Sequence, residues 1–394
     1  MSTEAEEIKA LARYAKEARP GCKVVVGGPY AITTPLDALS DAAVDFAVQG
    51  EGEVPARLLA EALRDGKDHS SIPGLVFRKN GEIVVNERAP GPENADSIPF
   101  PAWDLVDLEF YFGLWNRHSV SPFPASNRTV PVFTSRGCPY NCAYCHNIFG
   151  KKARFRSVGS VMKELELLTG RYGVREIEIV DDIFNLDLPR AKEICREIIR
   201  RDLRIKLSFP NGLRVDRMDN ELIALMKEAG THLIYYAIEA GSPQVQRRIN
   251  KDLDLAKARE MVRETDQRGI MVGGFFMLGF PGETWKELIS TVEFPRDLPF
   301  SVVSYFFVTP RPNTPLYETA LAIDPELGKA RLKDYFNFSV NLSAVSDLEL
   351  ERIMRLANEN FYTPARLWRA FRRIPSLKET LKMVLCAYLM RSRA

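Results

Sequence analysis

The chain has 394 residues, a length that predicts two or three domains. Its formal net charge of +2 gives no global field of the kind that attracts nucleic acid, and a hydrophobic content of 45% is enough for buried cores. Six cysteines over this length do not make a secreted disulfide scaffold, and the acidic first residues do not form a signal peptide. No apolar run approaches the roughly 20 residues that a membrane span needs. We therefore expect a cytoplasmic globular protein.

Residues 1–90 alternate between helical and strand patterns, which predicts an α/β domain with a parallel, doubly wound sheet. A hairpin is expected over 72–86, with Asn80-Gly81 as its type I′ turn. The other expected elements are helices over 4–18, 36–42 and 55–64 and strands over 23–29 and 45–48.

Residues 91–128 are rich in Pro, Asp, Asn and Trp and are expected to be a linker, anchored by the apolar run Phe100 to Asp104. Residues 129–345 repeat a strand and a helix at intervals of roughly 30 residues, as βαβ units do. Residues 346–394 are helical and basic in character. The expected strands of the βαβ region are 130–135, 176–180, 205–210, 233–238, 271–278 and 302–309.

Three cysteines lie close together directly after the first of these strands. Cys138, Cys142 and Cys145 have the spacing C-x3-C-x2-C, with Gly137 and a proline favouring a tight turn around the first of them. Three thiolates on one loop can hold three irons of a [4Fe–4S] cluster and leave the fourth iron open to a ligand. The loop also follows the carboxyl end of a strand, where barrel active sites lie.

Zinc is the main alternative for this loop. The three cysteines and His146 are a possible Cys₃His ligand set. Structural zinc sites usually place their second ligand pair farther along the chain, whereas His146 is adjacent to Cys145. The spacing therefore favours an iron–sulfur cluster over zinc.

The cysteine loop, with the aromatic Tyr144 before its last cysteine, resembles that of radical S-adenosylmethionine (SAM) enzymes. Segments after later strands resemble the same family, in the same order. The resemblance implies an open (β/α)₆ partial barrel, the TIM-like fold of the family, followed here by a helical extension. It also implies that SAM chelates the open iron through its amine and carboxylate and is cleaved reductively, so that a radical formed from it functionalises an unactivated carbon.

The resemblance implies further SAM-binding residues, each with a structural alternative. Tyr144 would lie near the adenine or would simply pack the loop. Asp181 and Asp182 would receive the SAM amine or position substrate, or would cap the next helix.

Two more strand ends add candidates. Asn211 and Arg214 belong to a segment similar to the family's Asn-Gly-Leu-Arg, where Arg214 would bind the SAM carboxylate or instead pair with Asp216 or Asp219. Glu239 would contact the ribose or amino group of SAM, or form an ion pair in the core.

The amino-terminal region resembles the second half of a cobalamin-binding domain. Gly27 and Gly28 follow the first strand, where such glycines let the nucleotide tail of cobalamin approach the strand end. No D-x-H-x-x-G motif is present, and Tyr30 stands where a His is often found. We expect an N-terminally truncated cobalamin domain, with Ser2-Thr3 as a remnant of the preceding segment.

The resemblance as a whole indicates a cobalamin-dependent radical SAM enzyme that performs methyl transfer or related carbon–carbon or ring chemistry. A non-methylating radical SAM enzyme, of oxidative or tRNA-modifying type, is one alternative, and an iron–sulfur or zinc protein without SAM chemistry is another. Expected partners are a small-molecule or lipid-like substrate and a low-potential donor such as a flavodoxin or ferredoxin, with no clear nucleic acid. The basic segment 361–373, together with 381–390, either caps the barrel or touches an anionic membrane surface.

Overall fold

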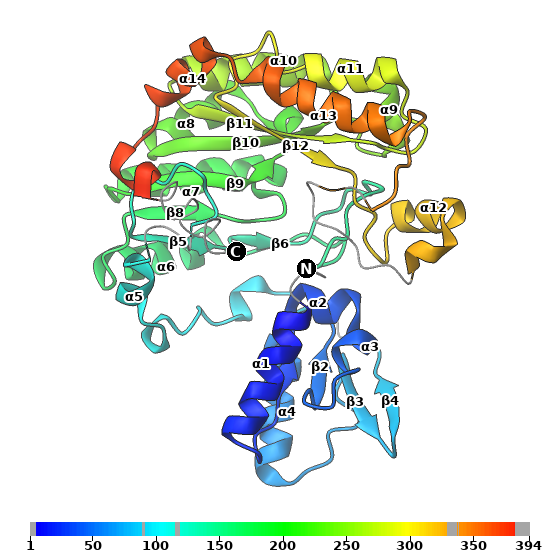
Figure 1. The fold of residues 1–394 in the computed structure, drawn as a ribbon. Helices are drawn as coiled ribbons and strands as arrows, with labels where there is room; N and C mark the ends of the chain where they lie inside the picture. Colours follow the sequence, from blue (N-terminus) through cyan, green and yellow to red (C-terminus); the bar gives the residue numbers. More distant parts are fainter. Residues whose placement is uncertain (1–4, 89–90, 115–118, 329–336, 338, 383–394) are drawn as a thin grey trace. The chain divides into compact units, whose positions relative to one another are not determined.

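The computed structural model describes residues 5–88, 91–114, 119–328, 337 and 339–382 (Figure 1). They form two compact units that interleave along the chain. The amino-terminal unit comprises Met1–Glu93, Ala143–Lys152 and Thr309–Val340, and the barrel unit comprises Asn94–Cys142, Ala153–Val308 and Asn341–Ala394. The expected remnant Ser2-Thr3 and residues 383–390 of the expected tail helix lie outside the described residues.

The amino-terminal unit is built on a four-stranded sheet with the order β1-β2-β3-β4. Only β1 and β2 are parallel, and β3 and β4 form the expected hairpin. Asn80 and Gly81 have φ values of 53° and 88°, as a type I′ turn requires. The elements are α1 (Ala5–Ala18), β1 (Val25–Val26), α2 (Gly28–Thr33), α3 (Pro35–Ala38), β2 (Phe46–Val48), α4 (Glu53–Asp65), β3 (Leu75–Lys79) and β4 (Glu82–Val85), with α12 (Pro315–Ile323) and η5 (Pro325–Gly328) from the later segment.

Two details of this unit differ from the sequence prediction. The strand expected over 23–29 is limited to Val25–Val26, because α2 already begins at Gly28 with Pro29 in its first turn, where proline fits a helix. The sheet is mixed rather than wholly parallel. Helices do cover both faces, since α1 and α4 contribute to separate core clusters on either side of the sheet.

The barrel unit contains the predicted six strands in one sheet, with the order β12-β11-β10-β9-β8-β5. Every neighbouring pair is parallel, as helical crossovers between successive strands require. All six predicted strand positions are confirmed to within a few residues. The strands are β5 (Thr129–Val132), β8 (Glu176–Ile179), β9 (Lys206–Leu213), β10 (Thr231–Glu239), β11 (Met271–Leu278) and β12 (Val302–Phe307).

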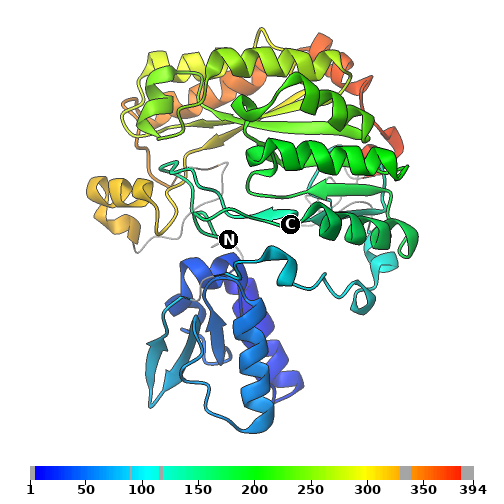
Figure 2. The same ribbon diagram turned by 180° about the vertical axis from the view of Figure 1, so that it is seen from behind.

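Helices cover one face of this sheet (Figures 1 and 2). Along β12, Val303, Tyr305 and Phe307 are buried while the residues between them are half-buried, so one face of the strand packs against helices and the other lines the inside of the barrel. The helices of two turns or more in the barrel unit are α6 (Val158–Gly170), α7 (Leu188–Arg200), α8 (Asn220–Glu228), α10 (Leu255–Gln267), α11 (Trp285–Glu293), α13 (Asp347–Phe361) and α14 (Pro364–Phe371); α5 (Leu108–Phe112) and α9 (Pro243–Arg248) are shorter.

The predicted linker packs on the barrel unit. The Trp103 Nε1–H donates to Glu164 of α6 at 3.1 Å, which anchors the linker segment with 3₁₀ turns η1 (Ala95–Ser97) and η2 (Trp103–Leu105). Glu178, buried on β8, accepts the backbone N–H groups of Val120 and Ser121 at 3.0 and 2.7 Å. In the described part of the chain, no helix is long and apolar enough to cross a membrane.

Candidate active site at the carboxyl edge of the barrel

The cysteine loop leaves the barrel unit through a two-stranded ribbon. Its first stem, β6 (Ser135–Arg136), pairs antiparallel with β7 (Arg154–Phe155), so the loop begins and ends at one place. Gly137, with φ of 87°, turns the chain from β6 into the loop; this left-handed conformation is unfavourable for other residues. The ribbon lies next to the carboxyl ends of β5 and β8, the edge at which barrel chemistry takes place.

Asp181 fixes the first stem of the loop. Its carboxylate accepts the backbone N–H of Thr134, the Thr134 hydroxyl and the Ser135 hydroxyl, each at 2.6 Å. Burial raises the pKa of Asp181, and these hydrogen bonds oppose that rise. Both oxygens are thus engaged in holding the loop.

Asp182 and Asn211 lie beside Asp181 on the same edge. The half-buried Asp182 carboxylate accepts the Gly137 N–H at 2.7 Å, directly before the first cysteine. The exposed Asn211 amide donates to the Asp181 carbonyl at 3.0 Å. The alternative of a helix cap is wrong for both aspartates, because Asp187 caps α7 through the Arg190 N–H.

Arg190, on α7, joins the two stems of the loop. Its Nη2 donates to the Thr134 carbonyl at 2.7 Å and its Nε to the Arg156 carbonyl at 2.8 Å, while its guanidinium lies over the Phe155 ring. Burial lowers the pKa of Arg190. A buried cation with these partners ties the ends of the loop to the barrel wall.

Tyr140 attaches the first half of the loop to the end of β9. The Arg214 guanidinium lies 3.9 Å from the centroid of the Tyr140 ring, and the Tyr140 hydroxyl accepts the Arg217 Nε–H at 2.9 Å. The predicted alternative for Arg214, an ion pair with Asp216, is present at 2.9 Å. The Arg214 Nη2 donates to the Lys251 carbonyl at 2.7 Å. Arg214 therefore connects the cysteine loop to the segment between α9 and α10.

Glu239 ends β10 in an unusual conformation. Its φ of 69° lies in the left-handed region, which a non-glycine residue adopts at some cost, and the register of β10 against β11 shifts just before it. The carboxylate is buried and accepts Lys251 Nζ at 3.2 Å. The ion pair in the core, one of the two alternatives for Glu239, is therefore present. It lies at the end of β10, where Glu239 has the left-handed backbone conformation.

The donor set of the cysteine loop fits an iron–sulfur cluster. Cys138 and Cys142 are half-buried, Cys145 is exposed, and none of the three is in a disulfide. Soft thiolates are the ligands such clusters use. Among the described residues, no three His, Cys, Asp or Glu gather closely enough to hold a single metal ion; a cubane does not need them to, since each thiolate binds a different iron.

The second half of the loop belongs to the amino-terminal unit. Within that unit, the Leu316 N–H donates to the Ala143 carbonyl at 3.0 Å, and Lys152 pairs with Glu93 at 2.8 Å. Tyr144 and Cys145 lie in this segment, and Tyr144 is half-buried. Burial lowers the pKa of the adjacent His146.

Gly27 and Gly28 also belong to the amino-terminal unit. A Cβ added at either glycine would meet no atom within 4 Å, so the end of β1 is open to a ligand. Tyr30 is buried and its hydroxyl donates to Asp37 at 2.5 Å, so it serves the core. An apolar groove of about 350 Å³ runs beside Gly27 between α1 and β1.

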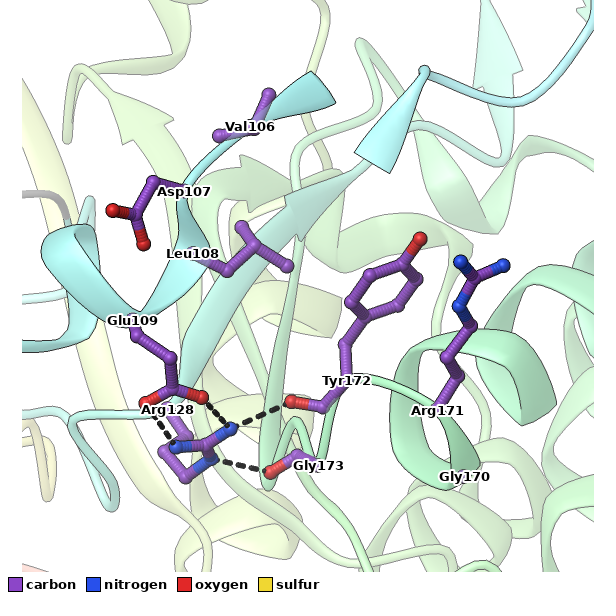
Figure 3. Close-up of a pocket in the computed structure, with 9 residues that line it drawn as sticks. All are labelled: Val106, Asp107, Leu108, Glu109, Arg128, Gly170, Arg171, Tyr172 and Gly173. Atoms are coloured by element: carbon purple, nitrogen blue, oxygen red, sulfur yellow. Dashed lines mark hydrogen bonds and ion pairs between the residues drawn. The ribbon is translucent and has the colours of Figure 1, made fainter. Parts of the chain in front are cut away.

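A further pocket, of about 410 Å³, opens at the opposite edge of the barrel unit (Figure 3). Arg128 dominates it, but its guanidinium is occupied by Glu109, at 2.9 and 2.7 Å, and by the carbonyls of Tyr172 and Gly173, both at 2.7 Å. The pocket lies at the amino ends of β5 and β8, away from the cysteine loop. The Arg128 guanidinium and its partners therefore attach α5 to the barrel unit.

Sequence reasoning missed four residues of the site. Thr134 and Ser135 carried a usable signal, because two hydroxyl residues between a strand and the cysteines are natural partners for a nearby carboxylate. Arg190 and Tyr140 carried none, since their partners lie 56 and 77 residues away in the chain.

Comparison with known proteins supports this description. Residues 132–294 match the family model of the radical SAM superfamily. An uncharacterized methyltransferase of Pyrococcus horikoshii is 34% identical over 315 residues, which cover 79% of this chain and 66% of the relative. The cytidylyl-2-hydroxyethylphosphonate methyltransferase of Streptomyces wedmorensis is 28% identical over 410 residues, which cover 94% of this chain and 76% of the relative.

Solved structures share the fold. The radical SAM methyltransferase TsrM of Kitasatospora setae matches with a TM-score of 0.68 and 22% identity, over 81% of this chain and 61% of its own. The cobalamin-dependent radical SAM enzyme OxsB matches with a TM-score of 0.70 and 17% identity, over 97% of this chain and 62% of its own. The chain thus spans less than two thirds of both solved chains and of the Pyrococcus relative. Within residues 132–294 it contains a radical SAM domain.

Proposed function

We propose that this protein is a radical SAM enzyme that functionalises an unactivated carbon of a small molecule, with methyl transfer as its reaction. The observation that carries the proposal is the attachment of the cysteine loop to the carboxyl edge of a six-stranded parallel sheet by Asp181 and Arg190. Family membership implies a [4Fe–4S] cluster and SAM. The methyltransferase names of two relatives favour methyl transfer.

Cys138, Cys142 and Cys145 would hold the cluster. The chemistry that such a cluster supplies, when bound, is the one-electron reduction of the SAM sulfonium. The chain's own contribution is to fix the loop and to supply polar groups around it. Asp181 and Arg190 fix the loop, because they form hydrogen bonds with residues of the two loop stems.

The other residues at the strand ends would contact SAM. Asp182 and Asn211 present polar groups at the edge next to the first cysteine. Arg214 and Glu239 are each held by one ion pair, with Asp216 and Lys251, so a SAM carboxylate or amine would share or replace that partner. Tyr144 would supply a face for the adenine.

The decisive experiment is SAM cleavage by anaerobically reconstituted, dithionite-reduced protein. We expect release of 5′-deoxyadenosine and methionine, and loss of both with Cys138→Ala, Cys142→Ala or Cys145→Ala. Cys22→Ala is the matched control, because this half-buried thiol lies outside the loop and should keep full activity. Wild-type protein that carries a cluster and releases no 5′-deoxyadenosine would be an iron–sulfur protein without SAM chemistry.

Cobalamin is part of the proposal. The open glycines at the end of β1 give space for its nucleotide tail, and the OxsB structure contains aqua-cobalamin. No imidazole follows β1, where Tyr30 is buried against Asp37, so this segment would contact the cofactor without ligating its cobalt. The amino-terminal unit would thus form one wall of a cobalamin site.

Matched glycine variants test that wall. Gly27 and Gly21 both have open space at Cβ and ordinary backbone angles, but only Gly27 lies at the strand end. We expect wild-type protein that has been incubated with hydroxocobalamin to keep bound cobalamin, seen as the visible absorbance of the cofactor. Gly27→Leu should reduce the amount of bound cobalamin, and Gly21→Leu should leave it unchanged. If wild-type protein retains none but still cleaves SAM, the non-methylating type of radical SAM enzyme replaces the methyltransferase proposal.

The partners follow from the chemistry. The reaction needs a low-potential electron donor, for which a flavodoxin or ferredoxin is suited, and a reducing compartment such as the cytoplasm. The inner face of β11 and β12 carries Phe275 and Phe306, with ring centroids 5.9 Å apart, and Phe275 stacks on Tyr235 at 4.6 Å. These rings favour a substrate with an apolar or lipid-like part.

A further inference from the structure

The carboxyl-terminal part of the barrel unit exposes a cluster of large apolar side chains. Trp368 and Phe371 of α14 stack on each other, with ring centroids 5.8 Å apart and an angle of 14° between the rings. Single exposed apolar residues are common on proteins, but three on one short helix, two of them stacked, form a patch that usually has a partner. We call this patch the tail surface; its members and exposed fractions are Leu367 (51%), Trp368 (62%) and Phe371 (44%), while Leu377 (40%) and Leu381 (58%) are exposed farther along the chain.

The other face of α14 is already docked on the barrel unit. Arg369 and Arg373 both pair with Asp266 of α10, the former at 2.5 Å. Arg366 donates to the Leu298 carbonyl at 3.1 Å, and Ala370 is buried beneath the helix. Residues 366, 369, 370 and 373 share one helical face. This docking fixes the helix with the tail surface directed away from the barrel unit.

The charge around the tail surface is strongly basic. Residues 361–382 contain six Lys or Arg and one acidic residue, a net charge of +5 (6 − 1). The acid, Glu379, is buried and pairs with Lys382 at 3.3 Å. Arg372 and Lys378 are exposed, and no ion pair joins either of them to another residue in the described part of the chain. Uncompensated positive charge therefore flanks the exposed aromatic and leucine side chains.

We propose that the tail surface docks on the headgroup region of an anionic lipid bilayer. A helix that combines exposed Trp, Phe and Leu with flanking Arg and Lys has the composition of an interfacial helix, whose rings enter the headgroup layer while the cations contact lipid phosphates. An acidic protein would match the charge but not the protruding rings. The sequence after Lys382 continues with Met-Val-Leu-Cys-Ala-Tyr-Leu-Met and then two arginines, the same combination again. Docking is independent of the proposed catalysis.

The test is vesicle flotation of the full-length, cluster-loaded protein. We expect binding to vesicles of phosphatidylcholine mixed with phosphatidylglycerol and little binding to pure phosphatidylcholine. Trp368→Ser combined with Phe371→Ser should weaken binding at least about tenfold, because each partly inserted ring contributes on the order of 1 kcal/mol. The matched control is Leu105→Ser with Leu348→Ser, which removes two even more exposed apolar side chains (82% and 71%) outside the tail surface and should bind normally.

A second pair of variants tests the charge. Arg372→Glu with Lys378→Glu should weaken binding to anionic vesicles by at least about thirtyfold, at about 1 kcal/mol for each cation lost. Arg204→Glu, at an exposed site on another surface, should have little effect. Circular dichroism and iron content confirm that each variant is folded.

Three results would overturn the proposal. One is no binding of the wild type to anionic vesicles. Another is equal loss of binding in the control variants. The third is concentration-dependent self-association of wild-type protein, abolished by Trp368→Ser with Phe371→Ser and unaccompanied by vesicle binding, which would make the tail surface an interface between copies.

Discussion

The carboxylate of Asp181 accepts two hydrogen bonds from Thr134, one from its backbone N–H and one from its hydroxyl, both at 2.6 Å. The two residues lie at adjacent strand ends, 47 positions apart in the chain. Because the cysteine loop begins three residues after Ser135, the geometry of the thiolates depends on this contact. The buried Asp181 carboxylate thus holds the start of the cysteine loop in place. This role differs from the direct contact with SAM that the family resemblance implies.

Asp181→Ala should therefore impair cluster assembly. The variant leaves three buried donors without an acceptor, which we expect to lower the free energy of unfolding by about 3 kcal/mol and to reduce bound iron by more than half. Asp181→Asn should be milder, near 1 kcal/mol, because the Thr134 and Ser135 hydroxyls can rotate to accept from the amide. Iron and sulfide counts with urea unfolding check both, and Asp104→Ala, at an exposed site, is the control. Normal iron content in Asp181→Ala would show that the loop does not need the hydrogen bonds to the Asp181 carboxylate.

Tyr140 is predicted to matter through its ring more than through its hydroxyl. Tyr140→Phe keeps the ring under the Arg214 guanidinium and loses the hydrogen bond to the exposed Arg217, so we expect nearly normal iron content. Tyr140→Ala removes the cation–π contact, worth about 1 kcal/mol, and frees the segment between the first two cysteines. Its cluster should be lost faster under air, as followed by the decay of its visible absorbance. Tyr111→Ala, at an exposed position on α5, serves as the control, and equal decay of all variants would contradict the prediction.

The barrel strands could be predicted from sequence because each is a continuous apolar, β-branched run with helical periodicity between it and the next. Such runs place the strand ends, and with them Asp181, Asn211 and Glu239. The amino-terminal strand was overestimated because the run Val24 to Val26 leads into Gly-Gly-Pro, where proline at the first turn starts a helix instead.

The polar contacts around the loop could not be predicted. Arg190 looks like any charged residue of an amphipathic helix, yet its guanidinium is buried and bonded to carbonyls in both loop stems. Similarly, two acidic residues at alternate positions of β8, Glu176 and Glu178, suggest an exposed strand face. Both are fully buried, because the linker folds back and donates backbone N–H groups to them. Contacts of this kind depend on tertiary placement, which local periodicity does not encode.

Glu239 and Lys251 form a buried pair whose members should be strongly coupled. Lys251→Met alone leaves a buried carboxylate without its cation, and we expect it to lower the free energy of unfolding by about 3–5 kcal/mol. Adding Glu239→Gln should recover much of this loss, since the amide needs no cation. Urea unfolding of the single and double variants gives the coupling energy, and additive losses would contradict the prediction.

The same variants separate structure from SAM binding at Glu239. If the carboxylate only serves Lys251, the double variant should bind SAM as well as wild-type protein does. If it also contacts SAM, affinity should remain reduced in the double variant even where stability has recovered. Equilibrium dialysis with SAM distinguishes the two results.

Glu283 should make stability depend on pH. It is buried after β11 and accepts the backbone N–H groups of Gly279 and Phe280 at 2.9 and 3.0 Å, and burial raises its pKa from 4.5 to about 7. Between these values the folded protein keeps a proton that the unfolded chain releases, so the free energy of unfolding falls as pH rises from 4.5 to 7. The full shift corresponds to about 3 kcal/mol at 1.36 kcal/mol per unit of pKa. Glu283→Gln cannot titrate and should flatten this part of the curve.

Glu287 provides a control of opposite sign one turn later. Although burial opposes it, the hydrogen bonds from Thr284 and Arg248 hold the pKa of Glu287 below its usual value, so its contribution to stability is present above the unfolded pKa and is lost as pH falls. Glu287→Gln should therefore destabilise the protein more near neutral pH than in acid. Urea unfolding at about pH 3, about pH 5 and about pH 8 separates the two groups: Glu283→Gln should change relative to wild type between pH 5 and pH 8, and Glu287→Gln should change in the opposite direction between pH 3 and pH 5. A Glu283→Gln curve parallel to that of wild type would mean that Glu283 is ionised in the folded protein throughout this range.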